Sequence, residues 1–124
     1  MVRAILLTHG TLGGALMASV ESVLGPQEDV IVLSNSGLAL DQILESLRAH
    51  VGDESCIIFV DFCGGSPFMA CKSISLSPEH LTVVSGVNLP MLLSFFTKRG
   101  QLSFAELSET VQHDGHRGIQ LHSE

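Results

Sequence analysis

Two residues whose side chains can do nucleophilic or acid–base chemistry each follow an aliphatic run. His9 follows the run Val2–Thr8, and Asp61 follows the run Ser55–Val60. A carboxylate that binds one imidazole nitrogen fixes the tautomer and leaves the other nitrogen free to attack. A simpler interpretation is open for each residue: His9 can bond a backbone carbonyl at a strand end, and Asp61 can cap a helix or form a turn.

Small residues follow both of these side chains. Gly10 comes directly after the histidine, and Gly64, Gly65 and Ser66 come shortly after the aspartate. Glycine lets a phosphate or a partner's backbone approach closely. We expect Ser66 to cap a helix that has Pro67 at its first position, where free N–H groups can bind an anion. An imidazole, an orienting carboxylate and an anion pocket together favour transient phosphorylation of a histidine.

The chain lacks the groups that would supply other chemistries. The phosphate-binding motif G-x-x-x-x-G-K-[ST] is absent, so we do not expect ATP to donate the phosphate directly. The cysteines Cys56, Cys63 and Cys71 are odd in number and form no C-x-x-C pair, which indicates reduced thiols and argues against zinc. We therefore expect no zinc site at these cysteines.

Strands and helices alternate in the pattern of apolar residues. We predict strands over Val2–Thr8, Asp29–Leu33, Ser55–Val60 and His80–Ser85, with a short last strand over Arg117–His122. We predict helices over Leu12–Leu24, Leu40–Val51, about Pro67–Ile74 and Asn88–Thr97, and a fifth that begins at the capping box Ser103–Glu106 and ends near His113. Asn88 is the expected N-cap of the fourth helix, and Pro90 suits its first turn.

This alternation predicts a single α/β domain over residues 1–124. We expect one open, mostly parallel, doubly wound sheet with helices on both faces, since the strands are continuously aliphatic. The short C-terminal strand would be antiparallel or exchanged in a dimer. Functional residues of such sheets gather at the carboxyl ends of the strands. His9 and Asp61 would therefore lie side by side if the first and third strands are neighbours.

Composition excludes several classes of function. The chain has 124 residues, a formal net charge of -7 and neither Trp nor Tyr, which argues against a nucleic-acid-binding face. No apolar run reaches the roughly 18 residues that a membrane span needs, and the N-terminus does not resemble a signal peptide. We expect a cytoplasmic protein whose acidic surface suits a basic partner or small molecules.

Three segments together resemble the Enzyme IIA domain (EIIA) of the mannose-type bacterial phosphotransferase system (PTS), the mannose/fructose/sorbose family. They are "THG" with His9, "FVDFCGGSPF" with Asp61, and "VSGVNLPMLL" from Val84 to Leu93. Their order and spacing match the family along nearly the whole chain. The pieces "GGSPF" and "GVNLPML" are the most specific.

The resemblance implies a function and partners. His9 matches the histidine that accepts a phosphoryl group from the phosphocarrier protein HPr and passes it to a IIB protein, here expected to be separate because the chain ends at Glu124. Asp61 matches the carboxylate beside that histidine, and Ser66 matches a serine lining the site. Family members are commonly homodimers in which the C-terminal strand, here roughly Arg117–Leu121, packs on the neighbour. Any membrane contact would be indirect, through a IIC/IID permease. The resemblance also implies that neither a metal nor a cofactor is needed.

The sequence departs from the family and leaves alternatives open. Threonine and tryptophan commonly follow the aspartate in the family, whereas Phe62 and Cys63 do so here. A stand-alone regulatory module, whose phosphorylation controls protein binding, would use the same histidine. A thiol enzyme would instead use Cys63 beside the imidazole. A metal site in the tail, at His113, Asp114, His116 and His122, is the remaining alternative, against a polar and mobile C-terminus.

Overall fold

The computed structural model describes residues 1–74, 76–77 and 79–123. Within these residues strands and helices alternate along the chain until two helices follow each other at the end. The strands are β1 (Arg3–Thr8), β2 (Val30–Ser34), β3 (Cys56–Val60) and β4 (Leu81–Val84). The helices are α1 (Leu12–Leu24), α2 (Leu40–His50), α3 (Ser66–Cys71), α4 (Leu89–Lys98) and α5 (Phe104–Arg117).

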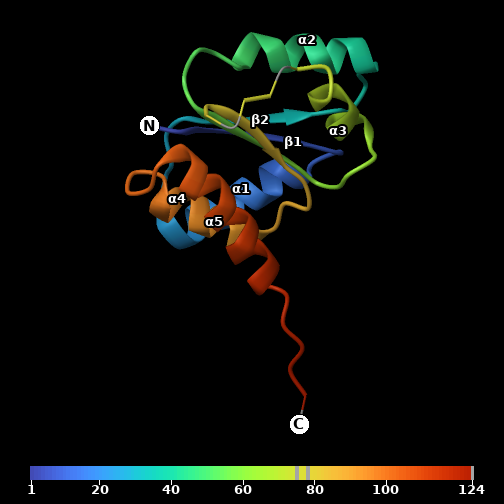
Figure 1. Ribbon diagram of the computed structural model, residues 1–124. Coiled ribbons are helices and arrows are strands. Elements are labelled where there is room, and N and C mark those ends of the chain that lie inside the picture. Colours follow the sequence, from blue (N-terminus) through green and yellow to red (C-terminus); the bar gives the residue numbers. More distant parts are fainter. Residues whose placement is uncertain (75, 78, 124) are drawn as a thin grey trace.

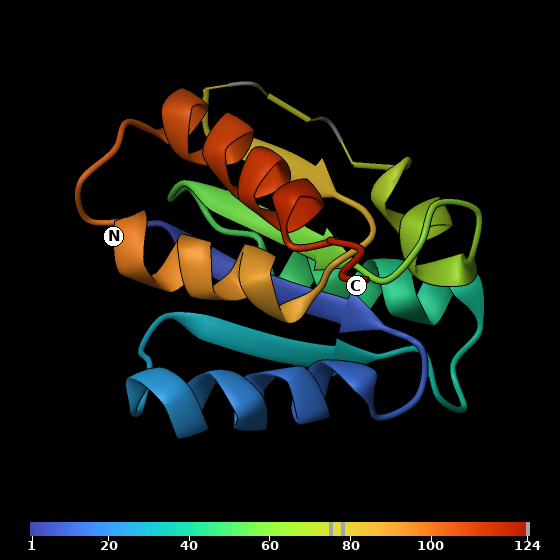
Figure 2. The same cartoon turned by 90° about the horizontal axis from the view of Figure 1, so that it is seen from below.

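The four strands form one parallel sheet in the order β2-β1-β3-β4. The arrowheads in Figure 2 all point toward the same end of the molecule. β1 and β3 are the central pair, and Leu7 lies opposite Val60 near their carboxyl ends. This register brings the residues that follow β1 and β3, His9 and Asp61, to the same edge of the sheet. The predicted open α/β sheet is confirmed.

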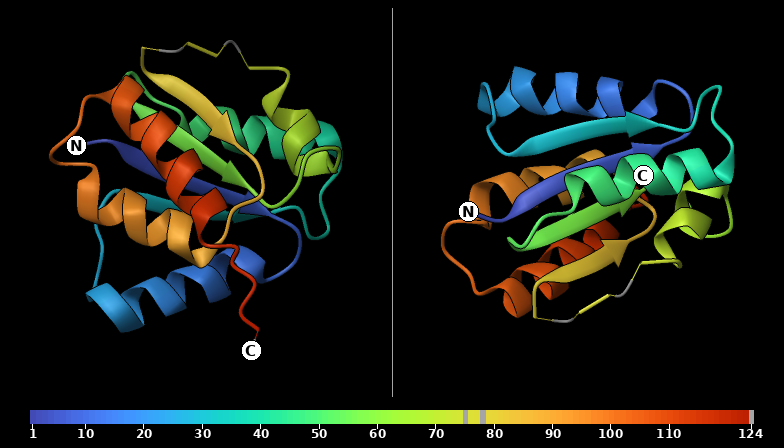
Figure 3. Two further views of the ribbon diagram at one scale, coloured as in Figure 1. Left: turned by 60° about the horizontal axis from the view of Figure 1, so that its bottom comes forward. Right: turned by 90° about the horizontal axis from the view of Figure 1, so that it is seen from above.

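Side chains alternate between the two faces of the sheet, and each face has its own helices. On one face Leu6 and Phe59 pack against α1, α4 and α5. On the other face Ile5 and Ile58 pack against α2 and α3. Figure 1 and the right-hand view of Figure 3 show α2 on the side opposite α1, α4 and α5. The central strands are buried on both sides, which explains why they read as continuous aliphatic runs.

The caps of the last two helices form as predicted. The Asn88 side chain accepts a hydrogen bond from the Met91 N–H at 2.9 Å, with Pro90 in the first turn of α4. Ser103 and Glu106 make both hydrogen bonds of a capping box at the start of α5. These side chains satisfy N–H groups that have no partner inside the helix.

The C-terminal segment differs from the prediction. α5 continues through Arg117 instead of ending near His113, and residues 118–123 have no regular structure, so the strand predicted over Arg117–His122 is wrong for the single chain. Tertiary contacts explain the longer helix, because the Asp114 carboxylate accepts hydrogen bonds from Ser94 and Lys98 of α4 at 2.6 Å each. The segment after α5 extends away from the domain (Figure 1).

Two of the three thiols are structural. Cys56 and Cys71 lie in the core beneath α2 and α3, and burial raises their pKa values to about 11 and about 12, so both stay protonated at neutral pH. Cys63 is exposed. In the described part of the chain, no helix has the length and apolar character that crossing a membrane requires.

Candidate functional site

His9 and Asp61 meet at the carboxyl edge of the sheet. The imidazole Nδ1 and the backbone N–H of His9 both donate to Asp61 Oδ2, each at 2.8 Å. The backbone bond fixes the carboxylate against the end of β1, and the ring bond fixes the imidazole against the end of β3. The two residues are 52 positions apart in the sequence, and the pairing of β1 with β3 brings them together.

This contact determines which imidazole nitrogen is available. An ionised carboxylate only accepts hydrogen bonds, so the proton lies on Nδ1 and the lone pair lies on Nε2. The His9 side chain is 39% exposed, whereas that of Asp61 is 10% exposed. The arrangement therefore leaves a nitrogen with a free lone pair on a partly exposed side chain, while the orienting carboxylate is mostly covered.

The environment of Asp61 keeps its carboxyl group ionised. Partial burial raises its pKa, but the hydrogen bonds from the His9 backbone and ring, together with the His9 charge, outweigh burial and hold the pKa below its ordinary value of 3.8. Asp61 is thus a carboxylate throughout the neutral range, as an orienting hydrogen-bond acceptor must be.

The residue after the aspartate covers one face of the imidazole. The rings of Phe62 and His9 are stacked, with centroids 5.0 Å apart and planes 15° from parallel. The Phe62 backbone N–H donates to Asp61 Oδ1 at 3.1 Å, so both carboxylate oxygens are bound. The sequence pointed to Phe62 only as a departure from the family, and gave no sign that it stacks on the histidine.

Gly65 approaches the Cε1 edge of the ring. A Cβ atom at Gly65 would lie 2.5 Å from His9 Cε1, closer than real side chains allow, and 3.0 Å from Nε2. Its backbone is extended, with φ -86°, so the requirement for glycine here is steric and not conformational. Gly64 differs, because its φ of +114° lies in the region that only glycine adopts readily. It turns the loop that brings Gly65 to the histidine.

Contrary to the prediction, Ser66 is not the N-cap of α3. Gly65 occupies the N-cap position of α3, with no side-chain cap, and Ser66 is the first helical residue. The Ser66 hydroxyl instead accepts a hydrogen bond from Asn35 Nδ2 at 3.2 Å. α3 also ends at Cys71 and not at Ile74. Ser66 therefore begins the helix and contacts Asn35, and does not cap the helix.

Asn35 lies in the candidate site, although the sequence analysis did not single it out. It follows β2, accepts a hydrogen bond from the Gly10 N–H through Oδ1 at 3.2 Å, and donates to Ser66. It therefore joins the loop after β1 to the start of α3. The signal in the sequence was the polar pair Ser34-Asn35 at a strand end, whose importance depends on β2 being the other neighbour of β1.

Other candidate residues are not drawn into this cluster. Asn88, in the loop after β4, caps α4 and donates to the Gly115 carbonyl at 3.0 Å. The hydrogen bonds among the described residues do not join Cys63 to His9. Asp114 of the tail cluster pairs with Lys98 and Arg117. Within residues 1–74, 76–77 and 79–123, no three His, Cys, Asp or Glu side chains are grouped as metal ligands.

The amino-acid sequence is similar to those of known phosphotransferase components. The chain is 31% identical over 124 residues to the mannose-specific PTS EIIAB component of Escherichia coli strain K12, covering 95% of this chain but only 38% of that protein. It is 33% identical over 115 residues to the sorbose-specific PTS EIIA component of Klebsiella pneumoniae, covering 90% of this chain and 85% of that protein. These relatives are components of phosphotransferase systems.

Solved structures and a family model agree with these relatives. The EIIA component of the phosphotransferase system from Streptococcus agalactiae superposes with a TM-score of 0.88 at 26% identity, covering 97% of this chain and 96% of that one. The family model described as "PTS system fructose IIA component" matches residues 3–112, a range that contains both His9 and Asp61. The chain therefore belongs to the mannose/fructose/sorbose EIIA family of the phosphotransferase system.

Proposed function

We propose that this chain is a phosphocarrier in which His9 accepts a phosphoryl group from phospho-HPr and passes it to a IIB protein. One observation carries the proposal: the Nδ1 proton of His9 is held by Asp61 at 2.8 Å, which leaves the lone pair on Nε2 of a side chain that is 39% exposed. An exchange between two proteins requires such a nucleophile, which is held in a fixed orientation and remains accessible.

The transfer conserves protons on the side of this chain. The Nε2 lone pair attacks phosphorus as the phosphorus–nitrogen bond of the donor histidine breaks, and the donor imidazole takes that electron pair. His9 keeps its proton on Nδ1, so its ring becomes positively charged. The Asp61 carboxylate stabilises that charge across the existing hydrogen bond. In the second step the IIB nucleophile attacks the same phosphorus and His9 leaves as a neutral imidazole.

We propose that the loops around Nε2 hold the phosphoryl group. We assign Gly10, Gly64, Gly65 and Ser66 to the border of this space. The missing side chain of Gly65 supports the assignment, because a Cβ atom there would lie 3.0 Å from Nε2. Gly10 and Ser66 lie on either side of Asn35, which bonds to both. Catalysis of this kind depends on in-line positioning more than on additional covalent chemistry, so no cofactor is invoked.

The experiment that tests the proposal follows phosphorylation directly. The protein is incubated with Enzyme I, HPr and phosphoenolpyruvate, and its intact mass is measured before alkaline mapping of the modified residue. We expect one acid-labile phosphoryl group on His9, and none on a His9→Ala variant that keeps the wild-type circular dichroism spectrum. Phosphorylation of His9→Ala, or an unmodified wild type beside active partners, would contradict the proposal.

The same experiment separates the alternatives. Addition of a IIB protein to the phosphorylated chain should discharge His9 if the chain carries phosphate for sugar transport. A regulatory module would keep the phosphoryl group and change its binding to another protein. For the thiol alternative, rapid alkylation of exposed Cys63 by iodoacetamide that depends on His9 would be required.

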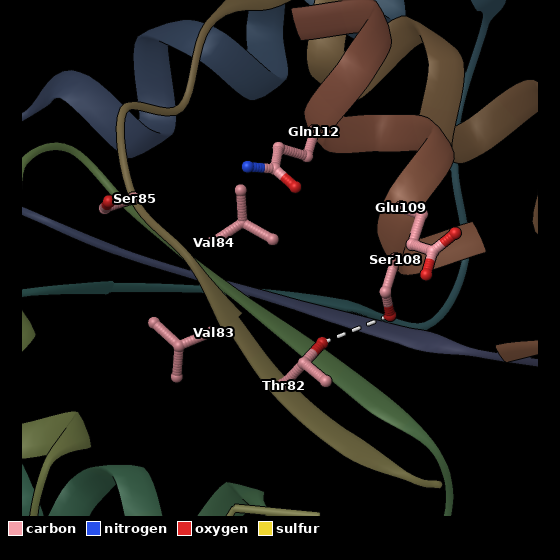
Figure 4. Close-up of a pocket in the computed structure, with 7 residues that line it drawn as sticks. All are labelled: Thr82, Val83, Val84, Ser85, Ser108, Glu109 and Gln112. Carbon is pink, nitrogen blue, oxygen red and sulfur yellow. Dashed lines mark hydrogen bonds between the residues drawn. The ribbon is translucent and has the colours of Figure 1, made fainter. Parts of the chain in front are cut away.

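We also propose a homodimer in the cytoplasm. β4 is an edge strand, and a groove of about 290 Å³ lies between it and α5, lined by Thr82, Val84 and Gln112 among others (Figure 4). Beyond α5, the apolar residues Ile119 and Leu121 are 77% and 95% exposed in the single chain. A second copy would cover such surfaces. Sedimentation should give a dimer for residues 1–124 and a monomer for a chain that ends at residue 117.

A further inference from the structure

Phe62 is placed differently from the other phenylalanines. Phe62 is 52% exposed, whereas the remaining five are buried or half-buried, with Phe59 and Phe95 fully enclosed in the core. A large apolar side chain gains little from burial when half of it stays in water. What its position does provide is contact with one residue, because its ring lies nearly parallel to the His9 imidazole at 5.0 Å.

The phenyl ring is fixed relative to the carboxylate as well as to the imidazole. The Phe62 N–H donates to Asp61 Oδ1 at 3.1 Å, while Asp61 Oδ2 accepts from His9. One carboxylate thus anchors the residue on each side of the stack. A Cβ atom at Gly65 would also lie 3.0 Å from Phe62 Cζ, so the glycine backbone closes in on both rings. The His9 imidazole is restrained at Nδ1, on one face and along its Cε1 edge.

We propose that Phe62 is a positioning residue that holds the His9 imidazole in plane and favours its positively charged, phosphorylated form; this role rests on the phosphocarrier function proposed above. Phosphorylation at Nε2 with the proton kept on Nδ1 makes the imidazole cationic. The face of an aromatic ring carries partial negative charge and attracts a cation stacked on it. The attraction is larger after the transfer than before it, so Phe62 shifts the equilibrium toward phospho-His9.

The role concerns stabilisation and orientation and adds no bond-making step. The phosphorus–nitrogen bond of the donor breaks, the bond to Nε2 forms, and no atom of Phe62 takes part. Phe62 stacks on the imidazole and Asp61 binds Nδ1, so neither contact uses the Nε2 lone pair that attacks phosphorus. From the usual strength of an exposed cation–π contact, we expect loss of the Phe62 ring to lower the equilibrium constant for phosphoryl transfer by about two- to fivefold.

The test compares Phe62→Leu, which keeps apolar bulk without an aromatic ring, with Phe62→Tyr, which restores the ring. Val23→Ala serves as the control, since Val23 is 61% exposed and lies near the far end of α1. The first readout is the NMR shift of the His9 ring protons in unphosphorylated protein, which reports the ring current of a stacked phenyl group. We expect this shift to be lost in Phe62→Leu and kept in Phe62→Tyr and Val23→Ala.

The second readout is transfer from phospho-HPr. Phe62→Leu should lower both the equilibrium constant and kcat by about two- to fivefold with KM for phospho-HPr unchanged, and Phe62→Tyr should restore both. A change confined to KM would make Phe62 a docking residue, and equal values for Leu and wild type would remove its role; either result overturns the inference. Absence of phosphorylation in the wild type would instead contradict the phosphocarrier function, and this inference with it.

Discussion

The Oδ2 atom of Asp61 accepts two hydrogen bonds from His9, one from the backbone N–H and one from the ring Nδ1, each at 2.8 Å. A single oxygen thereby connects the ends of two neighbouring strands and sets the tautomer of the nucleophile. The carboxylate is mostly covered, whereas the imidazole is 39% exposed.

Asp61→Asn should slow phosphoryl transfer to His9 by about 10- to 100-fold, the factor expected for loss of a charge-assisted hydrogen bond. An asparagine oxygen can still accept the Nδ1 proton, but it carries no charge to stabilise the phosphorylated ring. Rapid-quench kinetics with phospho-HPr measure the effect. The fold should be kept, since the residue size is unchanged, and a rate equal to that of wild type would rule out the electrostatic role of Asp61.

The stability contributed by Asp61 should depend on pH in a defined direction. Its pKa is lower in the folded chain than the ordinary value of 3.8, so the carboxylate stabilises the fold above that value and the contribution disappears as the pH falls through the folded pKa. Urea unfolding of wild type and Asp61→Asn should give the full difference in unfolding free energy at about pH 5, above the ordinary pKa of the carboxyl group. The difference should shrink below pH 3.8; growth of that difference in acid would contradict the assigned sign.

Gly65→Ala should impair the site more than the fold. The new methyl group would lie 2.5 Å from His9 Cε1 and must displace the imidazole, for which we expect transfer to slow by about tenfold or more. The cost in unfolding free energy should be only about 1 kcal/mol, because the backbone conformation suits alanine but the N-cap position does not.

Gly14→Ala is the matched control for Gly65→Ala. A Cβ atom at Gly14 would meet no neighbour within 4 Å, and the residue lies within α1. Alanine there should stabilise the protein by up to about 1 kcal/mol and leave transfer unchanged. Thermal unfolding and transfer kinetics on both variants provide the comparison, and equal transfer rates for the two would exclude a steric role for Gly65.

Asn35→Ala should weaken the connection between the loop after β1 and the start of α3. It removes the acceptor of the Gly10 N–H and the donor to Ser66, so the loop after β1 is no longer tied to α3. We expect a loss of about 1 kcal/mol in unfolding free energy and a severalfold lower rate of phosphorylation. Faster hydrogen exchange at the Gly10 amide would identify the cause, whereas unchanged exchange would show that the link contributes nothing.

The contact between His9 and Asp61 was predictable, because both residues directly follow segments whose pattern indicates buried strands. The aliphatic runs before His9 and Asp61 read as buried strands, and functional residues of such sheets gather at the carboxyl edge. What the sequence left open was whether the two strands are neighbours, which the order β2-β1-β3-β4 answers. The caps at Asn88 and Ser103 were predictable for a similar reason, since each motif is local.

The features that were missed depend on contacts between distant segments. Asn35 matters only because β2 lies beside β1, and the stack of Phe62 on His9 depends on how the loop after β3 folds back. Serine is a common N-cap residue, but here Gly65, which lies close to the His9 ring, occupies the N-cap position of α3. α5 is longer than predicted because side chains of α4 bind Asp114.

The pairing of β1 with β3 also determines when the site can exist during folding. β1 forms parallel ladders with both β2 and β3, and neither pairing is a local hairpin. Closing such a crossover costs chain entropy before any contact offsets it, so this step is slow compared with helix formation. His9 leaves the ribosome early but acquires its carboxylate only after a segment 52 residues later has joined the sheet. The oriented imidazole is therefore an indicator of completed folding across the first half of the chain.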